Sequence, residues 1–195
     1  MDYRLAHVLD SFSAHHDSFE DPLRAYVAAS EMVFAAVLVV LLLLVPGARR
    51  ELARRGAVAA AASLALALVL THLLASVVDR PRPFVAHPAT IHAFLAHAAD
   101  PGFPSEHSAA AFAIATAVAL RVRSWGAILF ALAGILAAGR VFLGLHYPSD
   151  VLVGAALGAG VALLCWIPPI RLRLDAAADT VGDRLDAAVK RAVPG

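Results

Sequence analysis

Five long apolar stretches most constrain what this chain can fold into. They lie at roughly 26–46, 57–78, 107–122, 125–145 and 150–170, and the stretch at 107–122 is short and rich in alanine. A helix needs about 20 apolar residues to cross the hydrocarbon core of a bilayer. Because backbone polar groups inside a bilayer must be satisfied within the segment, such stretches form helices. The sequence therefore predicts an all-α, polytopic membrane helix bundle with about five transmembrane helices.

The composition agrees with a chain that is buried in a membrane. Hydrophobic residues make up 61% and charged residues 16%, against roughly 45–50% and about 25% in soluble domains. A formal net charge of +1 gives no field that attracts nucleic acid, so we expect no nucleic-acid partner. Cys165 is the single cysteine and lies in an apolar stretch, so it predicts packing and excludes an intrachain disulfide.

Shorter segments surround the apolar stretches. Residues 3–16 and 22–29 are expected to form short interfacial helices, and residues 87–99 a mildly apolar helix that carries His92 and His97. Gly154 and Gly158 have the spacing of a helix-packing face. Beyond residue 171 charges alternate with alanine, which predicts a polar helix. We thus divide the chain into an N-terminal interfacial segment (1–25), a membrane domain (26–170) and a cytoplasmic polar tail (171–195).

The arginines predict the orientation. Three clusters follow the first, third and fifth apolar stretches, and basic residues concentrate in cytoplasmic loops. With five spans all three clusters fall on one side, so the N-terminus, the 79–106 loop and the 146–149 turn fall on the outer side. The clusters are Arg49, Arg50, Arg54 and Arg55; Arg121 and Arg123; and Arg171 and Arg173.

Three polar clusters are expected at the outer ends of the spans. They are DRPRPF at 79–84, PSEH at 104–107 and GRVFLGLHYPSD at 139–150. Their convergence from distant parts of the chain is the main sign of a functional site. Arg82 lies between two prolines that hold its backbone extended. Its guanidinium either reaches toward lipid headgroups at a span end or is aimed rigidly at an oxyanion.

The second cluster stands at the start of an expected helix. Ser105 is a good N-cap, and a plain capping role is as compatible with the sequence as a ligand role. A helix N-terminus also binds phosphate well, because its N–H groups are free. Glu106 in the first turn suits the helix dipole. Neither argument accounts for His107.

The third cluster combines a buried cation with a histidine and a carboxylate. Arg140 falls inside an apolar stretch, where an arginine should be paired or face a polar cavity. His146 and Asp150 are spaced so that the carboxylate can reach one ring nitrogen. The other nitrogen would then be free to act as a nucleophile or base.

Together these groups suit phosphate chemistry. Two arginines and a helix N-terminus can neutralise an oxyanion and its transition state. One histidine can attack phosphorus while a second protonates the leaving oxygen, and water then hydrolyses the phosphohistidine. No cluster of cysteine, histidine or carboxylate has the spacing of metal ligands, so we expect neither a metal nor any other cofactor.

The three motifs resemble those of the type 2 phosphatidic acid phosphatase superfamily, membrane lipid phosphatases related in fold to vanadium haloperoxidases. The family pattern is Lys-x6-Arg-Pro, Pro-Ser-Gly-His and Ser-Arg-x5-His-x3-Asp, and the likeness covers about residues 26–168. It implies a haloperoxidase-like phosphatase core. His146 would be the nucleophile and Asp150 its orienting partner, with His107 as the general acid. Arg82, Arg140 and Ser105 would hold the phosphate oxygens.

Within that superfamily the chain is most similar to the bacterial undecaprenyl-diphosphate phosphatases of the bacitracin-resistance type. Glu106 in place of the motif glycine and the N-terminal segment support this branch. The resemblance implies hydrolysis of a polyprenyl diphosphate among the membrane lipids of the bacterial plasma membrane, at a site facing the periplasm or cell exterior. It also implies recycling of the cell-wall lipid carrier. Alternatives are a phosphatase of phosphatidylglycerophosphate or phosphatidic acid, or a non-catalytic binder of lipid phosphate.

Two positions depart from the family pattern. Ala75 stands where the motif has lysine, and no lysine precedes Lys190; Gly139 replaces the motif serine. One hypothesis is that His72 or Arg80 supplies part of the missing charge, and the alternative is that His72 only hydrogen-bonds a neighbouring helix. Glu31, inside the first stretch, either faces the cavity or lies near the membrane interface.

Overall fold

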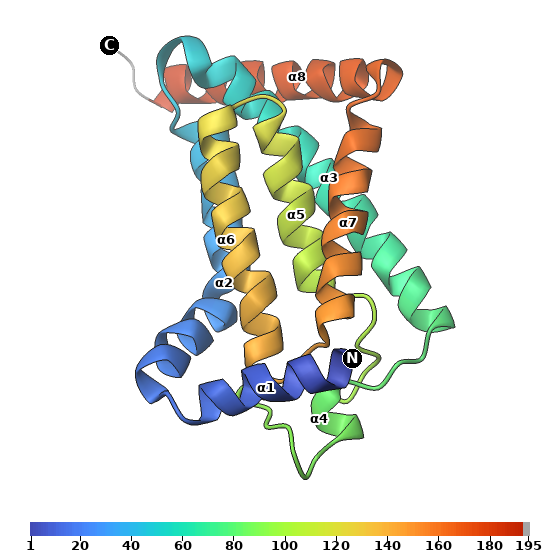
Figure 1. The fold of residues 1–195 in the computed structure, drawn as a ribbon. Coiled ribbons are helices and arrows are strands. Elements are labelled where there is room, and N and C mark those ends of the chain that lie inside the picture. Colours follow the sequence, from blue (N-terminus) through green and yellow to red (C-terminus); the bar gives the residue numbers. More distant parts are fainter. Residues whose placement is uncertain (193–195) are drawn as a thin grey trace.

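The computed structural model describes residues 1–192, and every regular element in that range is helical (Figure 1). α1 lies at one end of the helix bundle and α8 lies at the other. The elements are α1 (Asp2–Ala14), α2 (Asp17–Leu43), the 3-10 turn η1 (Gly47–Arg49), α3 (Arg50–Val77), α4 (Pro83–Ala86), α5 (Glu106–Ala119), α6 (Arg123–Phe142), α7 (Pro148–Cys165) and α8 (Pro168–Ala192).

The helices that run between the α1 end and the α8 end of the bundle are α2, α3, α5, α6 and α7 (Figure 1). Four of them, α2, α3, α6 and α7, are long and apolar enough to cross a membrane. The fifth, α5, has only 14 residues, or about 21 Å at 1.5 Å per residue. It lies in the centre against α3, α6 and α7, and nine of its 14 residues are buried. A helix covered by other helices has less need to match the bilayer thickness than one that faces lipid.

The contact between α5 and α7 is close because α7 carries glycines where the helices meet. A Cβ atom at Gly158 would overlap the carbonyl of Ala109, and one at Gly154 would overlap the carbonyl of Ser105. A Cβ at Gly160 would meet only open space. The packing face predicted from Gly154 and Gly158 therefore contacts α5 of the same chain, and this contact brings the N-terminal ends of α5 and α7 together.

The three arginine clusters lie at the same end of the bundle, where α8 crosses it (Figure 1). Ion pairs attach α8 to this end: Arg54 Nη2 lies 2.7 Å from Asp186, Arg55 Nη2 2.8 Å from Asp179 and Arg121 Nη2 2.8 Å from Asp175. The polar helix expected after residue 171 is thus present as α8. Residues 193–195 of the expected tail lie outside the described part.

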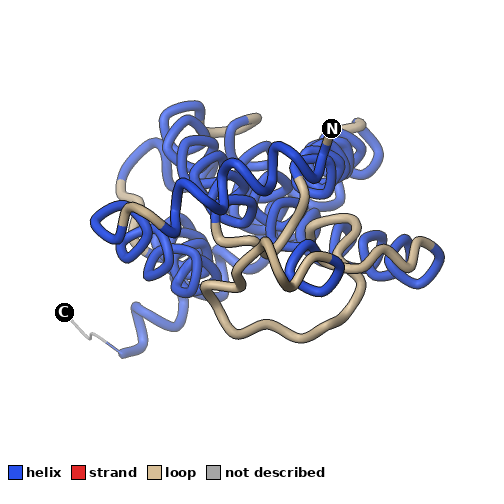
Figure 2. The backbone as a smooth tube through the Cα atoms, turned by 60° about the horizontal axis from the view of Figure 1, so that its bottom comes forward, coloured by secondary structure: helices blue, strands red, loops and turns tan. Residues whose placement is uncertain are grey.

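The opposite end is built from α1, α4 and a long irregular loop (Figure 2). The helix predicted for residues 87–99 is wrong, because the chain from His87 to Ser105 is not helical. Its backbone groups bond instead to distant partners: His92 N to Asp10 Oδ1 at 3.1 Å and Gly102 N to Arg80 O at 2.8 Å. The segment 22–29 is also not a separate helix, since α2 runs through it without a break.

Candidate active site

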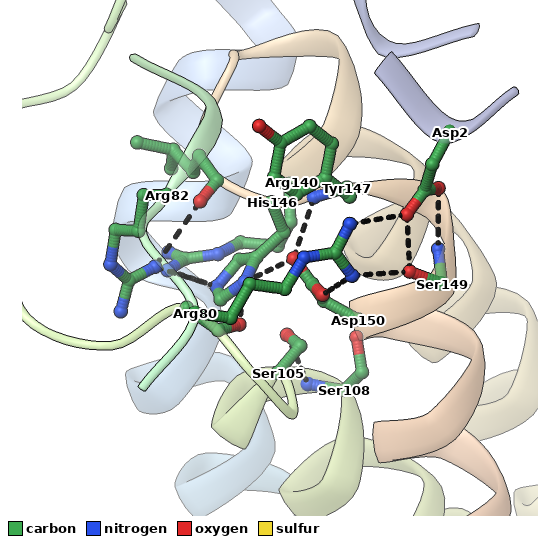
Figure 3. A network of polar contacts seen from close by, with 12 residues as sticks. Asp2, Arg80, Arg82, Ser105, Ser108, Arg140, His146, Tyr147, Ser149 and Asp150 are labelled. Carbon is green, nitrogen blue, oxygen red and sulfur yellow. Dashed lines mark hydrogen bonds and ion pairs between the residues drawn. The ribbon is translucent and has the colours of Figure 1, made fainter. Parts of the chain in front are cut away.

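The three polar clusters meet at the α1 end of the bundle (Figure 3). The residues come from several elements that are far apart in the sequence, and most of them stand at a helix end or in a loop. Arg82 precedes α4, Ser105 and His107 begin α5, Arg140 lies in the last turn of α6, His146 lies in the α6–α7 loop, and Asp150 lies in the first turn of α7.

His146 lies at the centre of the site with 1% of its surface exposed. Its Nδ1 lies 2.8 Å from the carbonyl oxygen of Gly102. Because a carbonyl only accepts, Nδ1 carries the proton and donates a hydrogen bond to this oxygen. Its Nε2 accepts from Arg82 Nη1 at 2.9 Å and from Arg140 Nη2 at 3.2 Å. Burial, reinforced by the charges of Arg140 and Arg82, holds the pKa of His146 well below its usual value. The imidazole is therefore neutral, with its lone pair on Nε2 between two cations.

Asp150 does not make the direct hydrogen bond to His146 that its spacing suggests. The distance from Oδ2 to Nδ1 of His146 is 3.8 Å, longer than a hydrogen bond. Oδ2 instead accepts the N–H of Tyr147 at 2.8 Å, and Oδ1 accepts from Arg80 Nη1 at 2.8 Å. Asp150 thus fixes the backbone that carries His146, while the Gly102 carbonyl holds the ring.

Arg82 points into the site, with 5% of its surface exposed. Its backbone is extended (φ −64°, ψ 154°), as the flanking prolines predict. Nε and Nη2 donate to the two carboxylate oxygens of Asp100 at 3.1 and 3.2 Å, and Nη1 also reaches Leu145 O at 3.2 Å. Burial opposes ionisation of Asp100, but the hydrogen bonds from Arg82 outweigh it and lower the pKa of that carboxyl.

Arg140 is buried in the polar surroundings that its position in an apolar stretch demands. Only 3% of its surface is exposed, and its Nη2 also donates to Nε2 of His97 at 3.0 Å. Within the described residues its Nε has no hydrogen-bond partner. The guanidinium therefore keeps donor capacity for an anion. The sequence does not predict His97 and Asp100 as site residues: His97 lies in the segment expected to be helical, and Asp100 directly follows it.

Ser105 has the capping geometry that its sequence position suggests. Its buried hydroxyl accepts the N–H of Ser108 at 3.4 Å, and its own N–H donates to the carbonyl of Asp150 at 3.0 Å. The second bond ties the start of α5 to the start of α7. The hydroxyl lies below Asp150 in the close view, at the base of the group (Figure 3).

His107 and Glu31 meet at a cavity of about 410 Å³ between α2, α3, α5 and α6. Nε2 of His107 lies 3.3 Å from Oε1 of Glu31, so Glu31 faces the cavity. Glu106 stands at the same polar part of the wall. The rest of the lining is largely apolar and includes Phe34, Leu38, Leu64, Leu68 and Ile114.

Arg80 and His72 have partners other than the central histidine. Arg80 donates to Ser149 Oγ at 2.7 Å, to Asp150 at 2.8 Å and to Asp2 at 2.6 Å, so two carboxylates neutralise it (Figure 3). Its guanidinium also lies 4.2 Å from the centre of the Tyr147 ring. His72 is exposed, with Nδ1 3.4 Å from Glu106 of α5. Arg80 thus binds Asp150 and Asp2, and His72 contacts a neighbouring helix.

Comparison with known proteins identifies the family to which this sequence and fold belong. The PAP2 superfamily profile matches residues 56–171, which contain all three polar clusters. Undecaprenyl-diphosphatase BcrC of Bacillus subtilis is 32% identical over 154 residues, 78% of this chain and 76% of that protein. Lipid A 1-phosphatase of Rhizobium johnstonii is 37% identical over 99 residues, 49% of this chain and 41% of that protein.

A solved structure has the same fold. The crystal structure of Aquifex aeolicus LpxE superposes with a TM-score of 0.62, covering 84% of this chain and 93% of that chain at 22% identity. The profile match covers more than half of the chain and includes the helices that carry the site. The chain therefore belongs to the PAP2 superfamily.

Proposed function

We propose that this protein hydrolyses undecaprenyl diphosphate to undecaprenyl phosphate and inorganic phosphate through a phosphohistidine at His146. One observation carries the proposal: the neutral, buried His146 presents its unprotonated Nε2 between the guanidinium groups of Arg82 and Arg140. A nucleophile held between two cations suits attack on an anionic phosphorus. Similarity to Undecaprenyl-diphosphatase BcrC along most of both chains supports the choice of substrate.

The first step transfers the terminal phosphoryl group to the protein. Nε2 of His146 attacks phosphorus, and the bond from phosphorus to the bridging oxygen breaks. Arg82 and Arg140 turn their N–H groups from Nε2 to the phosphate oxygens, with Ser105 at the base of the site. The Gly102 carbonyl accepts from Nδ1–H and so stabilises the positive ring that forms. His107 gives a proton to the leaving undecaprenyl phosphate.

The second step releases phosphate. Water attacks the phosphohistidine, His107 accepts one proton from that water, and the bond from nitrogen to phosphorus breaks. His146 returns to its neutral form with the lone pair on Nε2. Asp150 contributes by holding the backbone of Tyr147, next to His146, in place throughout.

The lipid chain has a place to lie next to this chemistry. The cavity of about 410 Å³ begins at His107 and Glu106 and continues along apolar side chains of α2 and α3. An apolar lining with a polar end suits a lipid whose headgroup enters the site. A second candidate is removal of the phosphate from another lipid, because Lipid A 1-phosphatase of Rhizobium johnstonii is 37% identical over 99 residues.

The proposed site faces the periplasm or cell exterior of a bacterial plasma membrane. The three arginine clusters lie at the opposite end, together with α8, and basic residues favour the cytoplasmic side. In this arrangement α1 lies at the outer interface and α8 lies along the cytoplasmic surface. Release of phosphate outside the cell would return the carrier lipid for cell-wall synthesis and, by removing the diphosphate form, confer bacitracin tolerance.

Substrate comparison tests the proposal. The protein, purified in detergent with EDTA, is given undecaprenyl diphosphate, phosphatidylglycerophosphate, phosphatidic acid and lipid A, and phosphate release is measured. We expect the highest kcat/KM with undecaprenyl diphosphate, and a loss of at least about 1,000-fold in His146→Ala. The exposed His15, changed to alanine, serves as the matched control. A higher kcat/KM with any other lipid, or no release from any of the four, would contradict the proposal.

A further inference from the structure

His97 is the one inward-facing residue in an exposed part of the α4–α5 loop. Its neighbours Ala96, Ala98 and Ala99 are exposed, whereas the His97 side chain is only 21% exposed. Its Nε2 lies 3.0 Å from Nη2 of Arg140. The same Nη2 lies 3.2 Å from Nε2 of His146. A phosphate that takes up the N–H groups of Arg140 beside His146 would therefore come within hydrogen-bond reach of His97.

The other side of the His97 ring faces acceptors. Nδ1 lies 3.3 Å from the carbonyl oxygen of Ala98 and 3.5 Å from Oδ1 of Asp100. Nδ1 therefore carries the proton, and Nε2 accepts from Arg140. Asp100 is held in turn by two hydrogen bonds from Arg82. A carboxylate fixed on this side of the ring is placed to stabilise an imidazolium.

The charge of His97 depends on what occupies the site. The groups that face it are Arg82, Asp100, His107 and Arg140. Burial, and then the charges of Arg82 and Arg140, lower the pKa of His97 below its usual value. An incoming phosphate carries negative charge, which offsets the positive charge of Arg140 near His97. It also draws the N–H groups of Arg140 toward itself, so the hydrogen bond from Arg140 to Nε2 of His97 is lost. Nε2 is then free to take up a proton.

We propose that His97 is a third cationic ligand of the phosphate, which it contacts through a protonated Nε2. The proposal rests on the proposed function only for the place of the phosphate, beside Nε2 of His146. It assigns the α4–α5 loop a binding role: His97 contacts the phosphate, and Asp100 positions both His97 and Arg82. It also gives the site a cation that titrates, unlike Arg82 and Arg140.

Binding of inorganic phosphate to the full-length protein in detergent tests this proposal without any turnover. Affinities are measured by calorimetry at pH 6, 7 and 8 for the wild type, His97→Ala, His97→Gln and His97→Lys, with His15→Ala as control. We expect His97→Ala and His97→Gln to weaken phosphate binding about 10- to 100-fold at pH 6 and less at pH 8. His97→Lys should retain tight binding at pH 8, because lysine stays charged there.

The variants separate charge from structure. Glutamine can still accept from Arg140, so recovery of wild-type affinity in His97→Gln would reduce His97 to a structural contact and overturn the proposal. Affinity within about twofold of wild type in His97→Ala at every pH would overturn it as well. Absence of phosphate binding in the wild type would do the same. If binding depends on His97 as expected but no lipid is hydrolysed, this inference stands and the proposed function fails.

Discussion

The close contact between α5 and α7 leads to a stability prediction that can be worked out from the structure. A Cβ atom at Gly158 would overlap the carbonyl oxygen of Ala109 and lie 2.8 Å from its carbonyl carbon and 2.9 Å from the backbone N of Ala113. These are backbone atoms, so no rotation of a side chain relieves the overlap. In Gly158→Ala the two helices have to move apart.

The expected size follows from two opposing effects. Overpacking of a close contact costs about 1–3 kcal/mol, whereas replacing glycine by alanine in a helix gains up to about 1 kcal/mol. Gly160, half a turn further along α7, would place its Cβ in open space and so has only the gain. The difference between Gly158→Ala and Gly160→Ala removes the shared helix term. We expect it to be about 1–3 kcal/mol, with Gly158→Ala the less stable.

Reversible unfolding in mixed micelles measures this difference. Both variants and the wild type are titrated with denaturing detergent, and the free energies of unfolding are compared at the same micelle composition. Equal stability of the two variants would refute the packing argument, because it would mean that α5 and α7 are not in backbone contact at Gly158. A loss of stability in Gly160→Ala alone would refute it equally.

Two further predictions concern the α1 end of the bundle. Asp2 accepts hydrogen bonds from Arg80 and Ser149, so Asp2→Ala should lower the free energy of unfolding by about 1 kcal/mol. The same substitution should reduce kcat more than it raises KM. An unchanged kcat in steady-state kinetics would contradict this prediction. His146 stays neutral when folded but is protonated below about pH 6.5 when unfolded, so the unfolded state binds more protons and stability should fall as the pH is lowered from 7 to 5. His146→Gln should flatten this pH dependence, and an unchanged slope in stability measurements would contradict the neutral assignment.

The sequence predicts the helices well because long apolar stretches have few alternatives in a bilayer. The motif residues also come together, because most of them lie at or near helix ends that meet at the α1 end of the bundle (Figure 3). α5 is harder to judge, because a central helix of 14 residues is shorter than the span rule assumes. Its alanine content, which allows close packing, is the feature that signals its enclosed position.

The orienting contact of His146 could not be predicted from residue spacing. Asp150 stands at the third position of α7. Its carboxylate accepts hydrogen bonds from the backbone N–H of Tyr147 and from the guanidinium of Arg80, and not from the imidazole of His146. The ring then bonds to the carbonyl of Gly102, and a backbone acceptor leaves no signature in side-chain identity.

The loop that completes the site was missed for a related reason. Residues 87–99 have a helical pattern of apolar side chains, but their backbone is held by Asp10 of α1 and by the α6–α7 loop. These tertiary bonds override local propensity. His97 reaches Arg140 from a segment that is not helical, so the wrong helix prediction for 87–99 also accounts for the missed contact of His97. Asp100 directly follows that segment and reaches Arg82.

The most direct test of the phosphohistidine mechanism is detection of the covalent intermediate on His146. The protein in EDTA is mixed with undecaprenyl diphosphate and quenched in alkali, where phosphohistidine survives, and its peptides are analysed by mass spectrometry. We expect one phosphoryl group on Nε2 of His146, and neither a phosphoryl group nor phosphate release in His146→Ala. Phosphate release that persists in His146→Ala, or that requires an added divalent metal, would contradict it.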